Sequence, residues 1–215
     1  MKIPEALLDG LIEFGHPRCV SPGESILHQG TLPDRVILLL DGQVKAVREQ
    51  PDGKPILLSI VEHKETLGAT GILSGMPRSC SIKAVTRCQI STLQANQFLK
   101  LARESELGDE LRRQAMIRVA DINAWHTLII HLPAKRKVCH ALLRFARRRP
   151  DGMHEVRLTH EEIGGSVGVS RQSVDNALHW LRRAGTVETE QRRVVILRWD
   201  HLVSLSESGQ RRAKS

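Results

Sequence analysis

Hydrogen-bonding side chains gather in a short stretch that follows Ser170, a residue suited to cap the start of a helix. The polar side chains of this stretch are Arg171, Gln172, Ser173, Asp175 and Asn176. Their donors and acceptors can match base edges in the major groove of DNA. Arg171 suits guanine, whereas Gln172 and Asn176 suit adenine. Asp175 is expected either to orient Arg171 from one turn away or to accept a hydrogen bond from cytosine.

Two short helices joined by a tight turn are predicted to position these side chains. Thr159 and Glu162 have the spacing of a capping box, so the first helix is expected to begin near His160. Gly168 can adopt the positive φ that the turn requires. The second helix should bury apolar residues spaced four and three positions apart, namely Val174, Leu178 and Leu181. The pattern predicts a helix-turn-helix; the alternative is a helical hairpin with a solvated polar face.

A β-hairpin is predicted after the second helix, because TVETE and VVILRW flank Gln191, Arg192 and Arg193. Arg192 and Arg193 are candidates to lie on the DNA backbone as a wing. The alternative is a hairpin that only closes the domain core.

The net positive charge is confined to the segment that holds this motif. Residues 133–215 contain 17 Lys and Arg against 9 Asp and Glu, whereas residues 1–132 contain 15 of each. The formal net charge of +8 therefore belongs to the second segment. A basic domain attached to a neutral one indicates a phosphate-binding module joined to a part with another task.

The first segment has the pattern of a compact antiparallel β-barrel or sandwich. Short apolar segments alternate with turn signals, and Asp41-Gly42 is a good hairpin turn. A short amphipathic helix is expected before it, over residues 4–14. After the long helix described next, a further helix is expected over residues 135–149, and the polar stretch 204–215 is expected to be frayed.

A long helix is predicted from about Leu107 to His131 and ends before Pro133. One side carries the seam of a coiled coil, with spacings of four and three residues, whereas Trp125, Leu128 and Leu132 point elsewhere and are expected to cover the β domain. The seam predicts pairing with a second copy of the chain, and its residues are Ala115, Val119, Ile122, His126 and Ile129. The alternative is a helix buried within one chain.

The order of these parts and several motifs resemble the Crp/Fnr family of bacterial transcription regulators, over nearly the whole chain. The motifs are LLLDGQVKAV at 38–47, LGATGILSGMPRSCSIKAV at 67–85 and LTHEEIGGSVGVSRQSVDNAL at 158–178. The resemblance implies an α+β protein with an N-terminal cyclic-nucleotide-binding-like β-roll over residues 1–106. A dimerisation helix over 107–132 and a winged helix-turn-helix over 133–215 would follow. It also implies a homodimer on palindromic promoter DNA that contacts RNA polymerase.

The resemblance points to an effector site whose identity stays open. Gly68, Arg78 and Ser79 match the family's phosphate-binding pattern, but Ala69 stands where the carboxylate for the ribose is expected. Asn123 lies near the position that meets the base. A missing acceptor costs about 1–3 kcal/mol, so cyclic AMP is expected to bind weakly or not at all. A different small anionic effector, or a tie between Arg78 and a local carboxylate, is the alternative.

Other sensing chemistries have weaker support. Cys19 alone cannot supply the N-terminal cysteine cluster of the family's iron–sulfur members. A haem-sensing regulator would draw its ligands from the histidines, namely His28, His63, His126 and His131. A thiol switch would use Cys80 and Cys88. All four cysteines, Cys139 included, fit better as small core residues in a reducing compartment.

Enzymatic activity is not expected. HEEIG at 160–164 begins like a zinc-protease motif, but Gly164 occupies the second ligand position. Cys139 and His140 are neighbours on a helix and point about 100° apart, so they do not form a nucleophile and base. No apolar run is long enough for a membrane span, and Glu5 and Asp9 interrupt any signal-peptide core. A cytoplasmic protein is therefore expected.

Overall fold

The computed structural model describes residues 11–51, 53, 55–62, 64–104 and 106–207. Contacts divide the chain into two units, of which the first holds residues 1–54 and 58–123 and the second holds residues 55–57 and 124–215. Most of the helix predicted over residues 4–14 lies outside the described residues, and residues 11–13 are helical.

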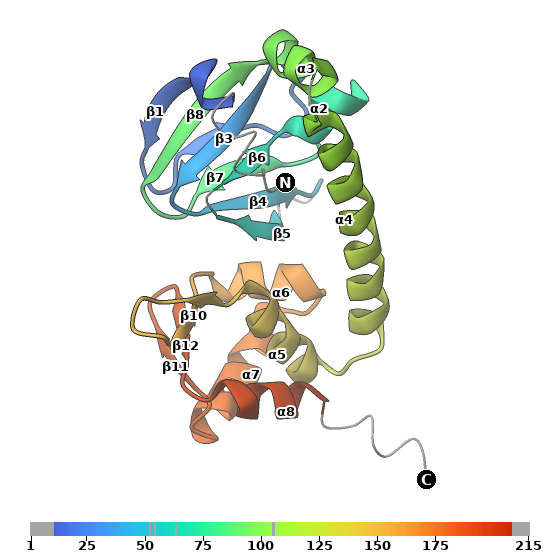
Figure 1. Ribbon diagram of the computed structural model, residues 1–215. Coiled ribbons are helices and arrows are strands. Elements are labelled where there is room, and N and C mark those ends of the chain that lie inside the picture. Colours follow the sequence, from blue (N-terminus) through green and yellow to red (C-terminus); the bar gives the residue numbers. More distant parts are fainter. Residues whose placement is uncertain (1–10, 52, 54, 63, 105, 208–215) are drawn as a thin grey trace. The chain divides into compact units, whose positions relative to one another are not determined.

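Two four-stranded sheets form the framework of the first unit (Figure 1). One has the order β1 (His16–Val20), β8 (Cys88–Gln94), β3 (Arg35–Asp41) and β6 (Glu65–Leu67). The other has the order β2 (Ser25–Leu27), β7 (Ser81–Ala84), β4 (Val44–Glu49) and β5 (Pro55–Val61). Both sheets contribute to one apolar core, with Leu39 of β3, Val44 of β4 and Cys88 of β8 among its fully buried members. This arrangement confirms the β-roll.

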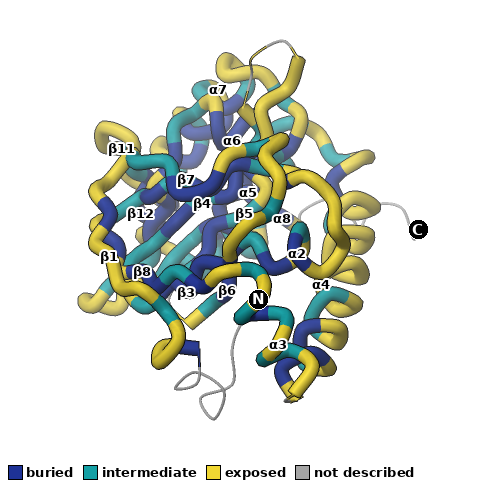
Figure 2. Tube along the Cα trace, turned by 90° about the horizontal axis from the view of Figure 1, so that it is seen from above, coloured by how far each residue is buried: buried dark blue, intermediate teal, exposed yellow. Residues whose placement is uncertain are grey.

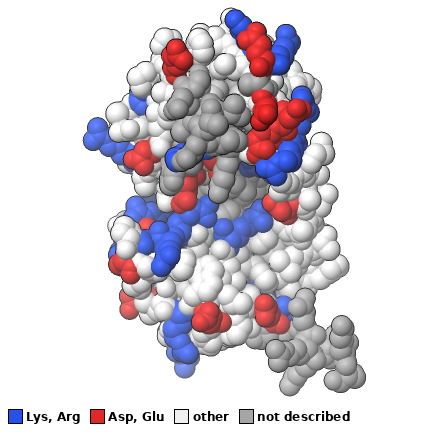
Figure 3. Space-filling model, in the orientation of Figure 1, with Lys and Arg blue, Asp and Glu red and all other residues white. Residues whose placement is uncertain are grey.

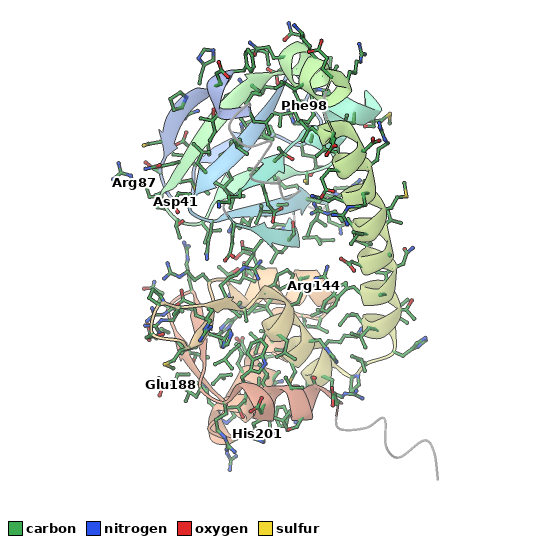
Figure 4. All side chains as sticks on the ribbon, in the orientation of Figure 1. Asp41, Arg87, Phe98, Arg144, Glu188 and His201 are labelled. Atoms are coloured by element: carbon green, nitrogen blue, oxygen red, sulfur yellow. The ribbon has the colours of Figure 1, made fainter. Side chains whose placement is uncertain are left out.

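The turn predicted at Asp41-Gly42 is present between β3 and β4, and it depends on glycine. The predicted hairpin is wrong, because β3 and β4 belong to different sheets and do not pair with each other. Gly42 has a φ of +93°, and a Cβ there would lie 2.5 Å from the backbone oxygen of Arg87. Figure 4 labels Asp41 and Arg87 at this end of the unit. A larger residue would therefore be both strained and obstructed.

A second apolar cluster covers the other face of β3 and β8. It includes residues of α2 (Ala69–Ser74), α3 (Ala95–Glu104) and the start of α4 (Leu107–Ile130), with Phe98 of α3 fully buried (Figure 4). Neither α2 nor α3 was expected from the sequence. These helices close the β-roll against the first turns of α4 and so fix where the long helix begins.

The second unit contains the predicted helix-turn-helix. After α5 (Ala134–Phe145) come β9 (Arg147–Arg148), β10 (His154–Val156), α6 (His160–Val167), α7 (Arg171–Arg183), β11 (Val187–Glu190), β12 (Arg193–Ile196) and α8 (Trp199–Glu207). The strands form one sheet in the order β11-β12-β10-β9. The helix expected over 135–149 is therefore too long, because Arg147 and Arg148 leave it to pair with β10.

The expectation of a frayed tail is wrong for residues 204–207, which belong to α8. Ser206 is buried, and its carbonyl oxygen accepts a hydrogen bond of 2.7 Å from Nε of Arg136. The imidazole of His154 also lies 4.3 Å from the ring centre of Trp199. Contacts from distant parts of the unit thus stabilise α8, which the polar sequence of residues 204–207 did not predict. Residues 208–215 lie outside the described part of the chain.

Candidate nucleic-acid interface and effector region

The helix-turn-helix forms as its sequence predicts. The Thr159 side chain accepts a hydrogen bond from the backbone N–H of Glu162, and the Glu162 carboxylate accepts one from the backbone N–H of Thr159, which completes the capping box. Gly168 ends α6 in the left-handed region, with a φ of +65°. Ser170 then caps α7 by accepting a hydrogen bond from the backbone N–H of Ser173.

One face of α7 is buried and the other is exposed. Val174, Leu178 and Leu181 are buried in the unit. Arg171, Gln172 and Asn176 are exposed, and the Gln172 amide donates a hydrogen bond of 3.4 Å to Oδ1 of Asn176. The side chains predicted to meet bases therefore project from the start of an exposed helix face, as a major-groove reader requires.

The structure overturns the expected pairing of Asp175 with Arg171. Asp175 instead contacts Nδ1 of His160, the first residue of α6. Arg171 lies 3.5 Å from the carboxylate of Glu161, and both of these side chains are largely exposed. Spacing along one helix could not reveal these contacts, because both partners come from the neighbouring helix.

The predicted hairpin is present as β11 and β12, with its turn at residues 191–192. Its two arginines differ in their surroundings. Arg193 pairs with Glu190 and lies 3.6 Å from the buried carboxylate of Glu155. Arg192 is exposed in the turn and has a φ of 58°. Arg192 is thus the residue of this pair that is placed to meet a ligand outside the domain.

The distribution of charge follows the two units. Figure 3 shows lysine and arginine gathered on the second unit, whereas basic and acidic side chains alternate on the first. The described arginines of the second unit's sheet and its connections include Arg147, Arg148, Arg149, Arg157, Arg192 and Arg193. This surface favours a polyanionic partner.

In the β-roll, Arg78 is buried and engaged by the protein itself. Its Nη2 donates hydrogen bonds of 3.3 Å to the Asp34 carboxylate and 2.8 Å to the Arg35 carbonyl oxygen. Its Nη1 is buried without a hydrogen-bond partner. This nitrogen lies so close to Gly68 that a Cβ added to the glycine would be 2.3 Å from it. The structure therefore brings Gly68 and Arg78 together and gives the guanidinium a local carboxylate.

The other proposed effector residues lie in different surroundings. Ala69, the first residue of α2, is buried in the second apolar cluster, so it does not offer a polar lining. Ser79 is exposed. Asn123 lies on an exposed part of α4. Nearer the start of this helix, the guanidinium of Arg118 donates a hydrogen bond of 3.2 Å to the Ser59 hydroxyl of β5.

The four cysteines are free thiols in unequal environments. Burial raises the pKa of Cys80 and Cys88 above their ordinary values and raises the pKa of Cys139 to about 12. Cys19 is exposed on β1, so the expectation that all four are core residues is wrong for it. Among the histidines named as haem candidates, His28, His126 and His131 are exposed, and His63 lies outside the described residues.

Most of the predicted dimer seam is uncovered within one chain. Val119 and Ile122 are 54% and 50% exposed, His126 is exposed and Ala115 is partly buried (Figure 2). Ile129 is only 8% exposed. Trp125 lies against Arg144 of α5 in the second unit rather than on the β domain, which corrects the expectation for that residue.

Comparison with known protein families gives two matches. A family described as "Cyclic nucleotide-binding domain" matches residues 17–105, and one described as "Crp-like helix-turn-helix domain" matches residues 136–205. The "CRP-like cAMP-activated global transcriptional regulator" of Mycobacterium tuberculosis is 28% identical over 180 residues, which cover 81% of this chain and 80% of the relative. The "cAMP-activated global transcriptional regulator CRP" of Pasteurella multocida is 25% identical over 179 residues, which cover 80% of this chain and 85% of the relative.

Solved structures share the fold. FixK2 of Bradyrhizobium japonicum superposes with a TM-score of 0.75 at 17% identity, covering 89% of this chain and 96% of that one. The c-di-GMP responsive global regulator CLP of Xanthomonas campestris gives a TM-score of 0.74 at 18% identity, covering 90% and 99%.

A β-roll sensory domain followed by a long helix and a winged helix-turn-helix defines a class of DNA-binding transcription regulators. Within that class, the chain belongs to the Crp/Fnr family. The matched relatives are transcription regulators rather than enzymes. Among the described residues, no helix is long and apolar enough to cross a bilayer.

Proposed function

We propose that this regulator acts as a homodimer that places one α7 in each of two successive major grooves of palindromic promoter DNA. The observation that carries this proposal is the exposed face of α7 with Arg171, Gln172 and Asn176, beside a wing whose Arg192 is exposed. Arg171 reads guanine, Gln172 and Asn176 read adenine, and Ser170, Ser173 and Arg192 contact the backbone.

The dimer is proposed to form along α4. The half-exposed Val119 and Ile122 lie three residues apart on a helix, with His126 a further four residues on. Pairing two such helices would bury apolar area that a single chain leaves in water. A two-fold axis along α4 would also match the symmetry of a palindromic operator, whose half-sites lie about 34 Å apart. RNA polymerase is the proposed partner at the promoter, in a cytoplasmic protein.

For the β-roll we propose weak or absent binding of cyclic AMP. Arg78 already has an anionic partner in Asp34, and Ala69 is buried in apolar surroundings where it cannot take a ribose hydroxyl. The names of the relatives show that their effectors differ, since some are called cAMP-activated and another c-di-GMP responsive. A different small anion, or no effector, is therefore compatible with membership of the family.

The test is binding of the purified full chain to its own promoter fragment and to a random fragment of equal length. Preference for the promoter fragment supports the proposal, and equal affinity for both contradicts it. Mass spectrometry and an absorption spectrum of the same preparation check for a co-purified nucleotide and for the Soret band of haem.

A further inference from the structure

The recognition helix is tied to the start of α6 by His160 and Asp175. Nδ1 of His160 contacts Oδ1 of Asp175, and the two side chains are 35% and 40% exposed. The pair thus lies at the surface, on the side of the unit proposed to meet DNA. The assignment of Arg171, Gln172 and Asn176 to bases leaves this pair without a role.

The position of Asp175 on α7 does not suit a base contact. With 3.6 residues per turn, Asp175 lies about 40° around the helix from Arg171 and about 100° from Asn176. Arg171 is 66% exposed beside Glu161, whereas the Asp175 carboxylate is 40% exposed and contacts His160 of α6. A carboxylate aimed at DNA would also be repelled by the phosphates. Asp175 is better placed to act on its protein neighbour.

The contact with Asp175 determines what the imidazole of His160 can offer to a ligand. A carboxylate accepts a hydrogen bond, so it selects the ring form with a proton on Nδ1 and leaves Nε2 for another partner. His160 lines a surface cavity of about 320 Å³ together with Arg171 of α7 and Arg192 of the wing. The other lining residues are Thr159, Glu161, Glu190 and Gln191. The start of α6, the start of α7 and the turn of the wing therefore line one cavity.

We propose that Asp175 is a positioning residue and that Nε2 of His160, oriented by it, donates a hydrogen bond to a DNA phosphate oxygen at this cavity. The inference rests on the proposed function. A phosphate oxygen only accepts hydrogen bonds, so the bound ring carries protons on both nitrogens.

The variant Asp175→Ala distinguishes this inference from two alternatives, because each predicts a different change in DNA binding. If Asp175 merely adds negative charge, its removal should tighten DNA binding. If it reads a base, its removal should relax preference at one base pair in each half-site. If it orients His160, its removal should weaken binding to promoter and random fragments alike, by about 10-fold. Only the last result supports the proposal.

The companion variant His160→Gln keeps a hydrogen-bond donor but cannot be protonated. We expect binding about 10-fold weaker, with the slope of log affinity against log salt less negative by about 0.9, the value for one phosphate contact. The double variant should bind no more weakly than His160→Gln, because Asp175 acts through His160.

His131→Gln is the matched control, since it removes an exposed histidine just beyond α4 and should leave the salt slope unchanged. An unchanged salt slope in His160→Gln, or tighter binding by Asp175→Ala, would overturn the inference while wild-type DNA binding remained intact. Failure of the wild-type protein to prefer its promoter fragment would instead contradict the proposed function. Thermal unfolding of each variant checks that it is folded. If one of the two single variants does not fold, the other still tests the inference.

Discussion

The guanidinium of Arg144 lies over the indole of Trp125, 4.3 Å from the ring centre. This contact joins the last part of α4 to α5, across the break at Pro133. The second unit includes the chain from Ala124 onward, so the end of the long helix belongs with the helix-turn-helix rather than with the β-roll. Ile129, in the same part of α4, is also buried.

Trp125→Leu is expected to weaken binding to a full palindromic operator more than binding to a single half-site. A cation–π contact contributes about 0.5–2 kcal/mol, and its loss would loosen the coupling between the proposed dimer helix and each reader. Fluorescence anisotropy with full-site and half-site duplexes measures the two affinities. Equal losses on both duplexes would show that Trp125 supports the reader itself and not its connection.

Arg171→Ala and Arg192→Ala are expected to differ in their effect on specificity. Arg171→Ala should cost about 1–3 kcal/mol on the operator and relax preference at one base pair in each half-site. Arg192→Ala should weaken binding to every sequence alike and make the salt dependence shallower. Competition with duplex libraries distinguishes the two outcomes. Equal losses on operator and random DNA for Arg171→Ala would remove its assignment as a base reader.

Replacing both Val119 and Ile122 by glutamate is expected to produce monomers. The exposed seam would then bring four like charges together across the two-fold axis, and their desolvation is prohibitive. Sedimentation velocity measures the result, with Met116→Glu as a control at an exposed residue of α4 outside the predicted seam. A double variant that stays dimeric would place the interface elsewhere.

Calorimetric titration with cyclic AMP and cyclic GMP is expected to give weak or no binding. Asp34→Asn should raise the affinity for either nucleotide, because it removes the anion that engages the buried Arg78 guanidinium. Arg78→Ala should abolish any binding that remains. Micromolar binding of cyclic AMP that strengthens operator binding in the wild-type protein would contradict the interpretation of Ala69. Full operator affinity without ligand would indicate control by protein abundance.

The stability of the second unit is expected to fall in mild acid because of His140. Burial and the nearby Arg136 lower the pKa of His140 in the folded state. The unfolded chain therefore binds more protons, so the stabilisation from the neutral ring is present above the ordinary histidine pKa of about 6.5 and is lost as the pH falls below it. Unfolding midpoints across this range should change less in His140→Gln. An unchanged slope in that variant would assign the pH dependence to other groups.

Local patterns in the sequence were sufficient to predict the helix-turn-helix and the order of the domains. The capping box of Thr159 and Glu162, the turn at Gly168 and the cap at Ser170 all form as expected, because each depends on residues within one turn of helix. The long helix likewise ends where Pro133 requires. Alternating apolar segments and turns such as Asp41-Gly42 predicted an antiparallel barrel or sandwich, and the resemblance to the Crp/Fnr family predicted the β-roll.

What the sequence by itself determined is therefore the fold class, the helix-turn-helix and the uneven charge, since these depend on periodicity, capping and composition. The tertiary structure decided the partners of individual side chains: His160 for Asp175, Asp34 for Arg78 and the apolar cluster for Ala69. It also decided that residues 204–207 are helical, because Arg136 binds the backbone there. Each of these contacts joins elements that are separate in the chain, and their energies depend on distances that no local pattern encodes.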